Sequence, residues 1–548
     1  MKQKIVLAAA VSMALFGSSC KKNFLAINTN PNAIPAAQED YGSLFTNAQL
    51  IASGNSDGNA YEDWRGNLIS ASCMIQHLSS TAGYWDGDKY FDNAGYLSSY
   101  WDQDFGPQPS GVNNQNTNSA PITNLVAITY NLRNDPKQVN LYNEARIFKV
   151  YLFQRLTDMY GDIPYSQAGL GYISGILEPV YDKQKDIYTD MLNQLDSAAA
   201  ALDPTAGTPG GSDLIYNGKV VEWQKFAYSE MVRIAMRMSK VDPTDAQTWV
   251  QKAVAGGTFA SNADNAILTH QAAAPNGAGS QVANGSGQVL GVIDPTSAHL
   301  SQTFVSFLQS TNDPRLSYFG TVIADATVAT DMGDTTAAHQ LGQPNGYDVT
   351  AGGKMNISTA PNFPRLPDTT SADSLTIYQN RYSFVNRYTF ARATAPTFFL
   401  TYSETELLLA EAAFRGWISG SAATHYANGV TAAMGQLTQA GAGPSDAIIG
   451  AYVTANPLVT GSELQMINNQ YWVASFMDET EAWANWRRSN FPTLTPTNYT
   501  GNATGGTIPR RYTYSTVEAA TNATNYSAAV SGLSQGDKMT SRVWWDAP

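Results

Sequence analysis

Residues 141–165, LYNEARIFKVYLFQRLTDMYGDIPY, repeat apolar and aromatic side chains at steps of three and four residues. This spacing is typical of an amphipathic α-helix, and Gly161 and Pro164 are expected to end it. The apolar face comprises Leu141, Ala145, Phe148, Tyr151, Leu152, Leu156, Met159 and Tyr160. A helix of this length with an apolar face is expected to pack against further helices.

The same periodicity recurs along the chain. It predicts helices over residues 187–202, 223–240, 247–255 and 463–488. Ser403 and Glu406 match a capping box at the start of SETELLLAEAAFRGW, and ATHYANGVTAAMGQL follows after a short connection, so an antiparallel helical hairpin is predicted. Helix pairs of this size are typical of tetratricopeptide units, although no strict repeat is present. We predict a mainly α, irregular helical domain with tetratricopeptide-like helix pairs.

Long segments rich in Gly, Asn, Thr and Pro separate the predicted helices. They cover residues 54–67, 85–124, 260–395 and 490–537. Structureless loops of this length are uncommon in compact domains unless they are functional. We therefore expect long ligand-binding loops.

The N-terminus has the pattern of a lipoprotein signal peptide. Lys2 and Lys4 precede an apolar run over residues 5–16, which is shorter than the ~20 residues of a membrane-spanning helix. Small residues then lead into Cys20. We predict that residues 1–19 are removed, that Cys20 carries a lipid anchor in a membrane, and that residues 20–548 form one binding domain. A soluble secreted protein with an incidental Cys20 is the alternative.

Charge and composition restrict the kind of ligand. The formal net charge is −13, and removing Lys2 and Lys4 with the signal peptide makes it −15. Such a surface repels phosphate backbones, so no nucleic-acid partner is expected. Charged residues are only 14% of the chain, and the abundant Ser, Thr, Asn and Tyr suit neutral ligands rich in hydroxyl groups.

Motifs for catalysis or metal binding are not evident. The histidines are widely scattered, without metal-ligand spacing, at His77, His270, His299, His339 and His425. Asp478 and Glu481 lie one helical turn apart and form the best carboxylate pair for a glycoside hydrolase, although solvation of a helix surface is the simpler explanation. We predict no catalytic residue, no cofactor and no metal.

One stretch stands out as a candidate ligand site. YWDGDKYFDNAGYLSSYW, residues 84–101, contains seven aromatic residues among turn-forming Gly, Asp and Asn. Aromatic rings stack on the apolar face of a sugar, and polar side chains bind its hydroxyl groups. The predicted ligand-binding residues are Arg65, Trp85, Asp88, Tyr90 and Trp101. The alternative is that these rings pack in a loop-rich core.

Several phrases in order along the chain resemble one family. They are FLAINTNPNA after Cys20, LTDMYGDIPYSQA, YSETELLLAEAAFRGW, EAWANWRRSNFP, IPRRYTYSTVEAATN and the terminal SRVWWD. Together they resemble the SusD/RagB-like outer-membrane nutrient-binding lipoproteins, in the SusD-like subgroup. The resemblance implies a helical, non-enzymatic binding protein that sits as a lid over a TonB-dependent transporter of the SusC type.

The resemblance also implies the ligand class and the location. Members of this family capture oligosaccharides or, in RagB-like cases, peptides. Their ligand-contacting residues vary, and the shared motifs are implied to be structural. We therefore expect a lipid-anchored protein of the outer membrane, facing the cell surface, that binds oligosaccharides and delivers them to a SusC-like transporter. The alternatives are a peptide- or protein-binding tetratricopeptide-like scaffold and a surface glycoside hydrolase.

Overall fold

The computed structural model describes residues 39–54, 62–106, 120–272, 282–350, 352–364 and 381–548. The chain divides into two units, Met1–Tyr41 and Gly42–Pro548, and the fold below is that of the second. The predicted signal peptide and Cys20 lie outside the described residues. No helix among the described residues is both long and apolar enough to cross a membrane.

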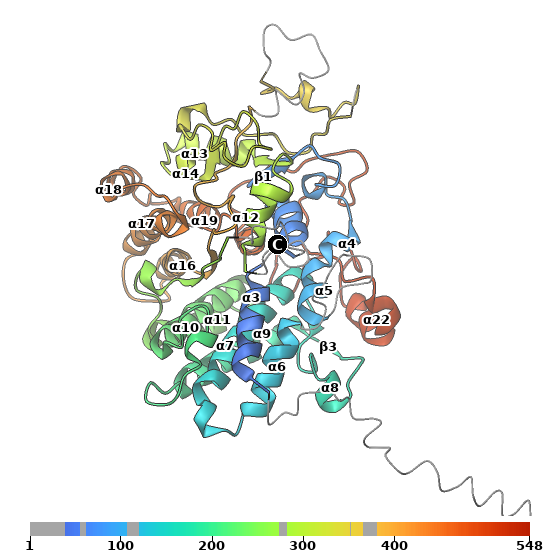
Figure 1. The fold of residues 1–548 in the computed structure, drawn as a ribbon, viewed down its shortest axis with the longest axis vertical. Coiled ribbons are helices and arrows are strands. Elements are labelled where there is room, and N and C mark those ends of the chain that lie inside the picture. The colour runs from blue at the N-terminus through green and yellow to red at the C-terminus, as the bar shows by residue number, and fades with distance from the viewer. Residues whose placement is uncertain (1–38, 55–61, 107–119, 273–281, 351, 365–380) are drawn as a thin grey trace, which may run out of the picture. The chain divides into compact units, whose positions relative to one another are not determined.

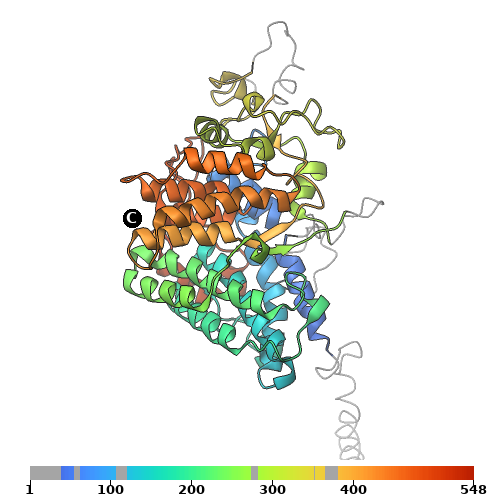
Figure 2. The ribbon, with the colours of Figure 1, turned by 90° about the vertical axis from the view of Figure 1, so that its left-hand side faces the viewer.

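Stacked helices form most of the second unit (Figure 1). Helices α6 and α7, α7 and α9, α9 and α10, and α10 and α11 pack in sequence, and α10 also contacts α16, which starts a second set with α17, α18, α19 and α20. Figure 2 shows the orange helices of the second set layered on the green α10 and α11. These helices are α6 (Pro121–Leu132), α7 (Val139–Tyr160), α9 (Gln184–Ala201), α10 (Val220–Arg237), α11 (Pro243–Gly256), α16 (Tyr402–Phe414), α17 (Ala422–Ala440), α18 (Asp446–Ala455), α19 (Glu463–Ala474) and α20 (Glu479–Ser489). The predicted mainly α fold with paired helices is confirmed.

Helix α7 contains the periodic apolar side chains from Leu141 to Tyr160. It ends at Gly161, which has a positive φ of 88° that favours glycine. The helix is buried on more than its apolar face, because α6, α9 and α10 all pack against it. Polar side chains such as Glu144 and Asp158 are therefore buried with the apolar ones.

Two predictions about helix boundaries are wrong. The helix predicted over residues 463–488 is two helices, α19 and α20, separated at Met477, whose φ is +80°. The capping box of α16 is formed by Thr401 and Glu404, two residues before the predicted pair. Thr401 Oγ1 accepts from the Glu404 N–H, and the Glu404 carboxylate accepts from the Thr401 N–H in return.

The remaining helices and strands are short, and many of them lie in the predicted loops. The helical ones are α3 (Tyr41–Ala52), a π-helix η3 (Glu62–Ser72), α4 (Ala94–Leu97), α5 (Ser99–Phe105), α8 (Gly171–Ser174), α12 (Gly285–Gln288), a π-helix η9 (Val289–Ile293), α13 (Gln302–Ser310), α14 (Leu316–Phe319), α21 (Glu518–Thr521) and α22 (Ala523–Ser531). The strands are β1 (Leu78–Ser80), β2 (Ile163–Pro164), β3 (Tyr181–Asp182), β4 (Ala266–Leu268), β5 (Ala298–Leu300), β6 (Gly320–Thr321), β7 (Phe384–Val385) and β8 (Thr397–Leu400).

Most of the strand pairs join segments that are distant in sequence, and β2–β3 is a local pair. The strands pair antiparallel as β1–β5, β2–β3, β4–β8 and β6–β7. In the first pair Leu78 lies opposite Leu300 and Ser80 opposite Ala298. This pair brings the aromatic stretch 84–101 next to the loop that follows η9, and these two segments build the candidate site.

Candidate functional site

The structure buries the rings that were predicted to be exposed. Trp85 and Tyr90 are 0% exposed, and Trp101 is 3% exposed. Trp101 packs among other rings, with Tyr181 stacked at a centroid distance of 5.6 Å and Tyr514 edge-on at 5.5 Å. The expected exposure is therefore wrong for these three rings. Trp101 packs in an aromatic cluster, whereas the buried Tyr90 accepts a hydrogen bond from the Thr497 N–H at 3.2 Å.

Asp88 is likewise buried and holds three segments together. Its carboxylate accepts hydrogen bonds from Ser79 Oγ of β1 at 3.3 Å and from the Gly346 N–H at 3.1 Å. It also pairs at 3.0 Å with Lys89, whose ammonium is buried and donates to the backbone carbonyls of Ser80 and Trp85. Each of these contacts is structural.

Other rings of the same stretch do face solvent. Tyr84 is 43% exposed. Tyr96 is half-buried, and the guanidinium carbon of Arg65 lies 5.2 Å from its ring centroid. Arg65, itself half-buried, is thus the one predicted residue that the structure leaves at the surface beside an accessible ring. Tyr84 and Tyr96 were part of the quoted aromatic stretch, but no sequence signal separated them from their buried neighbours.

A hydrogen-bonded chain ties Tyr84 to the loop after η9. Tyr84 Oη lies 2.9 Å from Ser297 Oγ, and Ser297 donates to Asp294 Oδ1 at 2.5 Å. The indole N–H of Trp85 donates to Asp294 Oδ2 at 2.6 Å. The adjoining Val292 and Ile293 are 61% and 40% exposed, so apolar surface lies next to this chain of polar groups. We call Arg65, Tyr84, Tyr96, Val292 and Ile293 the tyrosine face.

The carboxylate pair considered for hydrolysis is held in ion pairs, which are buried for Glu481 and partly buried for Asp478. Glu481 accepts hydrogen bonds from Arg237 and, at 2.6 Å, from the Tyr471 hydroxyl. Burial acts to raise the pKa of Glu481, but Arg237 and Arg233 outweigh it and hold that pKa below its usual value. Asp478 pairs with Arg155 at 3.2 Å. Neither carboxylate lies on a solvated helix surface, and Glu481 remains ionised, which is unfavourable for a general acid.

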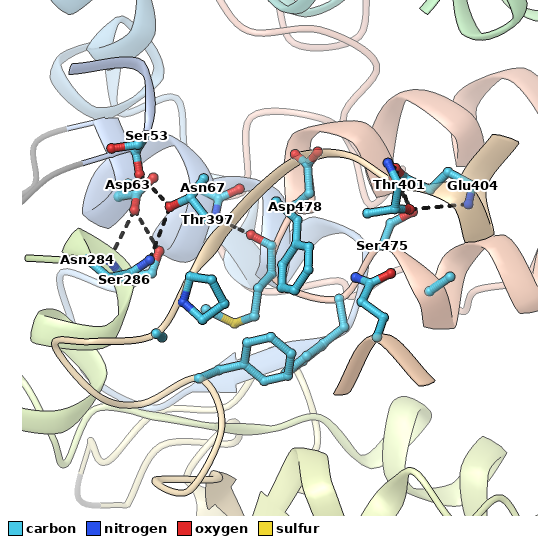
Figure 3. Close-up of a pocket in the computed structure, with 18 of the residues that line it drawn as sticks. Ser53, Asp63, Asn67, Asn284, Ser286, Thr397, Thr401, Glu404, Ser475 and Asp478 are labelled. Atoms are coloured by element: carbon cyan, nitrogen blue, oxygen red, sulfur yellow. Dashed lines mark hydrogen bonds between the residues drawn. The ribbon is translucent and has the colours of Figure 1, made fainter. Parts of the chain in front are cut away.

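A polar cavity lies where the helical stack meets the N-terminal segments (Figure 3). Asp63 of η3 accepts from the backbone and hydroxyl of Ser286 at 3.0 and 2.9 Å on one side, and Thr401 and Glu404 line the other. The cavity has a volume of about 60 Å³, which is room for a few waters. This volume is far below the roughly 300 Å³ of small-ligand sites. This cavity is therefore too small for a sugar.

Burial perturbs the acids around this cavity. It raises the pKa of Asp63 to about 7 and that of Glu404 to about 7. Burial also raises the pKa of Asp478, and the nearby Arg155 partly offsets this increase. Within the described residues, no group of three or more His, Cys, Asp or Glu side chains is placed to hold a metal ion. The cavity is thus a small polar joint between segments, and burial raises the pKa of two of its carboxyl groups to about 7.

Solved structures resemble the chain over nearly its full length. A chitin-binding protein is 31% identical, with a TM-score of 0.77 over 93% of this chain and 100% of its own. A Bacteroidetes SusD-like protein is 26% identical, with a TM-score of 0.78 and the same coverage. A chitin-binding SusD homologue from Flavobacterium johnsoniae is 21% identical with a TM-score of 0.66, over 92% of this chain and 98% of its own, and shows the fold alone.

A family model gives the assignment. The model of SusD-like proteins described as starch-binding and associating with the outer membrane matches residues 32–515. A search of curated proteins found no match. Since the family model covers most of the chain and the structural relatives share its fold, the chain belongs to the SusD-like family of starch-binding proteins associated with the outer membrane.

Proposed function

We propose that this chain is an outer-membrane lipoprotein that binds oligosaccharides at the cell surface and delivers them to a TonB-dependent SusC-like transporter. The family match supports the outer-membrane location and the carbohydrate ligand. The predicted acylation of Cys20 supplies the anchor, because acyl chains contribute about 0.8 kcal/mol per buried methylene group. No catalytic step is part of the proposal.

The tyrosine face is the observation that carries the binding function. It combines an exposed and a half-buried tyrosine ring, an arginine and exposed apolar side chains, which the loop after β1 and the short helices η3, α4 and η9 hold in place. This combination suits a sugar, whose apolar C–H face stacks on a ring while its hydroxyl groups bind polar side chains. We propose it as the glycan site in place of the buried Trp85, Tyr90 and Trp101.

Chitin oligosaccharides are the proposed first ligands to test. The relative at 31% identity is named a chitin-binding protein. N-acetylglucosamine units also fit the tyrosine face chemically, because they offer both an apolar ring face and amide and hydroxyl groups. We expect micromolar or weaker affinity, since a ligand destined for transfer must also dissociate.

Calorimetric titration of a glycan panel tests the binding function. The purified protein is expected to bind one class of oligosaccharide, and Tyr84→Ala is expected to weaken that binding about tenfold or more. Tyr130→Ala is the matched control, because Tyr130 is 42% exposed on α6, outside the tyrosine face. New reducing ends in the incubated glycan, or binding of peptides without glycans, would select the rival hydrolase or scaffold functions.

Fractionation of membranes tests the anchor. The Cys20→Ala variant is expected to leave the outer-membrane fraction and to lose labelling by a radioactive fatty acid. Wild-type protein in the soluble fraction would contradict the lipoprotein prediction. Co-purification of the tagged wild-type chain with a TonB-dependent transporter, identified by mass spectrometry, tests the delivery step.

A further inference from the structure

Resting on the glycan-binding function proposed above, we infer that Tyr84 recognises a ligand hydroxyl or amide N–H. We call the hydrogen-bonded chain from Tyr84 through Ser297 to Asp294 the relay. The relay leaves the phenolic oxygen of Tyr84 able only to accept a hydrogen bond from the ligand. The polarity of the group that Tyr84 recognises follows from the direction of each hydrogen bond in the relay.

The direction of the relay follows from the groups at its inner end. The Trp85 indole N–H is a donor only, so Asp294 Oδ2 accepts from it. The other carboxylate oxygen, Oδ1, accepts the Ser297 hydroxyl proton at 2.5 Å. A serine hydroxyl has one proton to donate, and Ser297 already donates it in the hydrogen bond to Asp294. Ser297 Oγ can therefore only accept from Tyr84, so Tyr84 donates its single proton inward.

Burial keeps the relay in this direction. Trp85, Asp294 and Ser297 are buried, whereas Tyr84 is the partly exposed member. Water therefore has little access to these three groups and cannot readily replace the hydrogen bonds that fix their directions. Partial burial and the Asp294 carboxylate also raise the pKa of Tyr84, so the phenol keeps the proton that it donates. The lone pairs of Tyr84 Oη then present a pure acceptor at the tyrosine face.

A pure acceptor discriminates between ligand groups that are similar in size. A sugar hydroxyl and the amide N–H of an N-acetyl group both have a proton to donate, but a methyl ether at the same position does not. A net hydrogen bond contributes about 1 kcal/mol, which corresponds to about a fivefold change in affinity. We therefore expect one position on the sugar at which O-methylation weakens binding about fivefold or more.

Comparing methylated ligands on the wild type and on Tyr84→Phe tests whether Tyr84 acts as a hydrogen-bond acceptor. The probes are an oligosaccharide that binds the wild type and its series of mono-O-methyl ethers, titrated by calorimetry. For the wild type, at least one ether is expected to bind about fivefold more weakly than the parent. For Tyr84→Phe, which keeps the ring and lacks the oxygen, that same ether is expected to lose no more than a factor of two relative to the parent.

Reversing the relay gives a second, independent test. In Asp294→Asn the amide oxygen still accepts from Trp85, while the amide NH₂ donates to Ser297 Oγ. Ser297 then donates to Tyr84, and the Tyr84 proton becomes available to the ligand. This variant is expected to bind the discriminating ether as well as, or better than, the parent sugar. A role of Asp294 in structure alone would change both affinities equally.

The outcomes separate this inference from the function on which it rests. Equal losses for every ether in the wild type and in Tyr84→Phe would overturn the acceptor assignment. An unchanged preference in a folded Asp294→Asn would overturn the direction of the relay. If the wild type binds no oligosaccharide at all, the proposed function itself fails. Tyr130→Phe serves as the control for loss of a comparably exposed phenol elsewhere.

Discussion

Asp88 shows how a residue chosen as a ligand contact can instead be placed to stabilise the fold. Its carboxylate is the anionic partner of the buried Lys89 ammonium. Removing one partner of a buried ion pair leaves the other charged and uncompensated, which costs about 3–5 kcal/mol. Asp88→Ala is therefore expected to lower the free energy of unfolding by about this amount, as measured by urea denaturation.

An exposed ion pair provides the control for this prediction. Asp196 pairs with Lys252 at 2.5 Å, but both side chains are partly solvated. Exposed pairs contribute about 0–1 kcal/mol, so Asp196→Ala should change stability little. Equal effects of the two substitutions would show that the Asp88–Lys89 pair is not the reason for any loss.

The aromatic stretch marks the limit of prediction at the residue scale. Composition located the stretch that contributes Tyr84 and Tyr96 to the tyrosine face, but it did not show which rings are accessible. Tyr84 and Trp85 are adjacent, yet the first is 43% exposed and the second is fully buried. Irregular turns, including a left-handed Tyr90 with φ of 55°, remove any regular alternation. Exposure here depends on the packing of β5 and the loop after η9, which are some two hundred residues away in sequence.

At the scale of elements, Asn67 maintains the break between α19 and α20. Its side-chain amide donates to the Met477 carbonyl at 3.0 Å, and its carbonyl oxygen accepts from the Glu479 N–H at 3.0 Å. Asn67→Ala leaves both backbone groups without these buried partners, at a cost of about 1–3 kcal/mol each. We expect a loss of about 2 kcal/mol or more in the free energy of unfolding.

Asn193→Ala is the matched control for Asn67→Ala. Asn193 is exposed on α9, where its amide donates to a carbonyl of its own helix. Water can replace that contact, and alanine has the higher helix propensity, so stability should change by less than about 0.5 kcal/mol. A loss of stability for Asn193→Ala as large as that for Asn67→Ala would contradict the role of the two Asn67 hydrogen bonds.

The same break explains which elements the sequence could predict. Periodicity located α7, α9, α10, α11, α16 and α17, because each has a repeating apolar face and a local stop signal. The residues around Met477 contain no glycine or proline to announce a break. Its anchor, Asn67, is 410 positions earlier in the chain, so only the folded structure brings the cause and the effect together.

For the whole molecule, buried carboxyl groups predict an unusual dependence of stability on pH. Burial raises the pKa of Asp63, Asp104, Glu230 and Glu404 to about 7 each. The usual values in an unfolded chain are about 4, so the folded state binds more protons between about pH 4.5 and pH 7. Stability therefore falls as pH rises through this window, and urea midpoints should be higher at pH 5.5 than at pH 7.5.

Glu144 extends this dependence to higher pH and allows it to be tested with one substitution. Within the described residues its two carboxylate oxygens have no hydrogen-bond partner, and burial, aided by Asp213, raises its pKa to about 9. The folded state thus keeps the Glu144 proton that the unfolded chain releases near pH 4.5. From pH 7 to pH 9 this group should cost the wild type about 2 kcal/mol of stability.

Glu144→Gln removes this contribution without removing the side-chain volume. The amide cannot ionise, so the variant is expected to lose about 2 kcal/mol less than the wild type between pH 7 and pH 9, while other titrating groups affect both proteins equally. Glu178→Gln, at an exposed glutamate, should follow the wild type. Parallel pH profiles for Glu144→Gln and the wild type would mean that Glu144 does not retain its proton. The decline of stability toward alkaline pH would then have to arise from other buried groups.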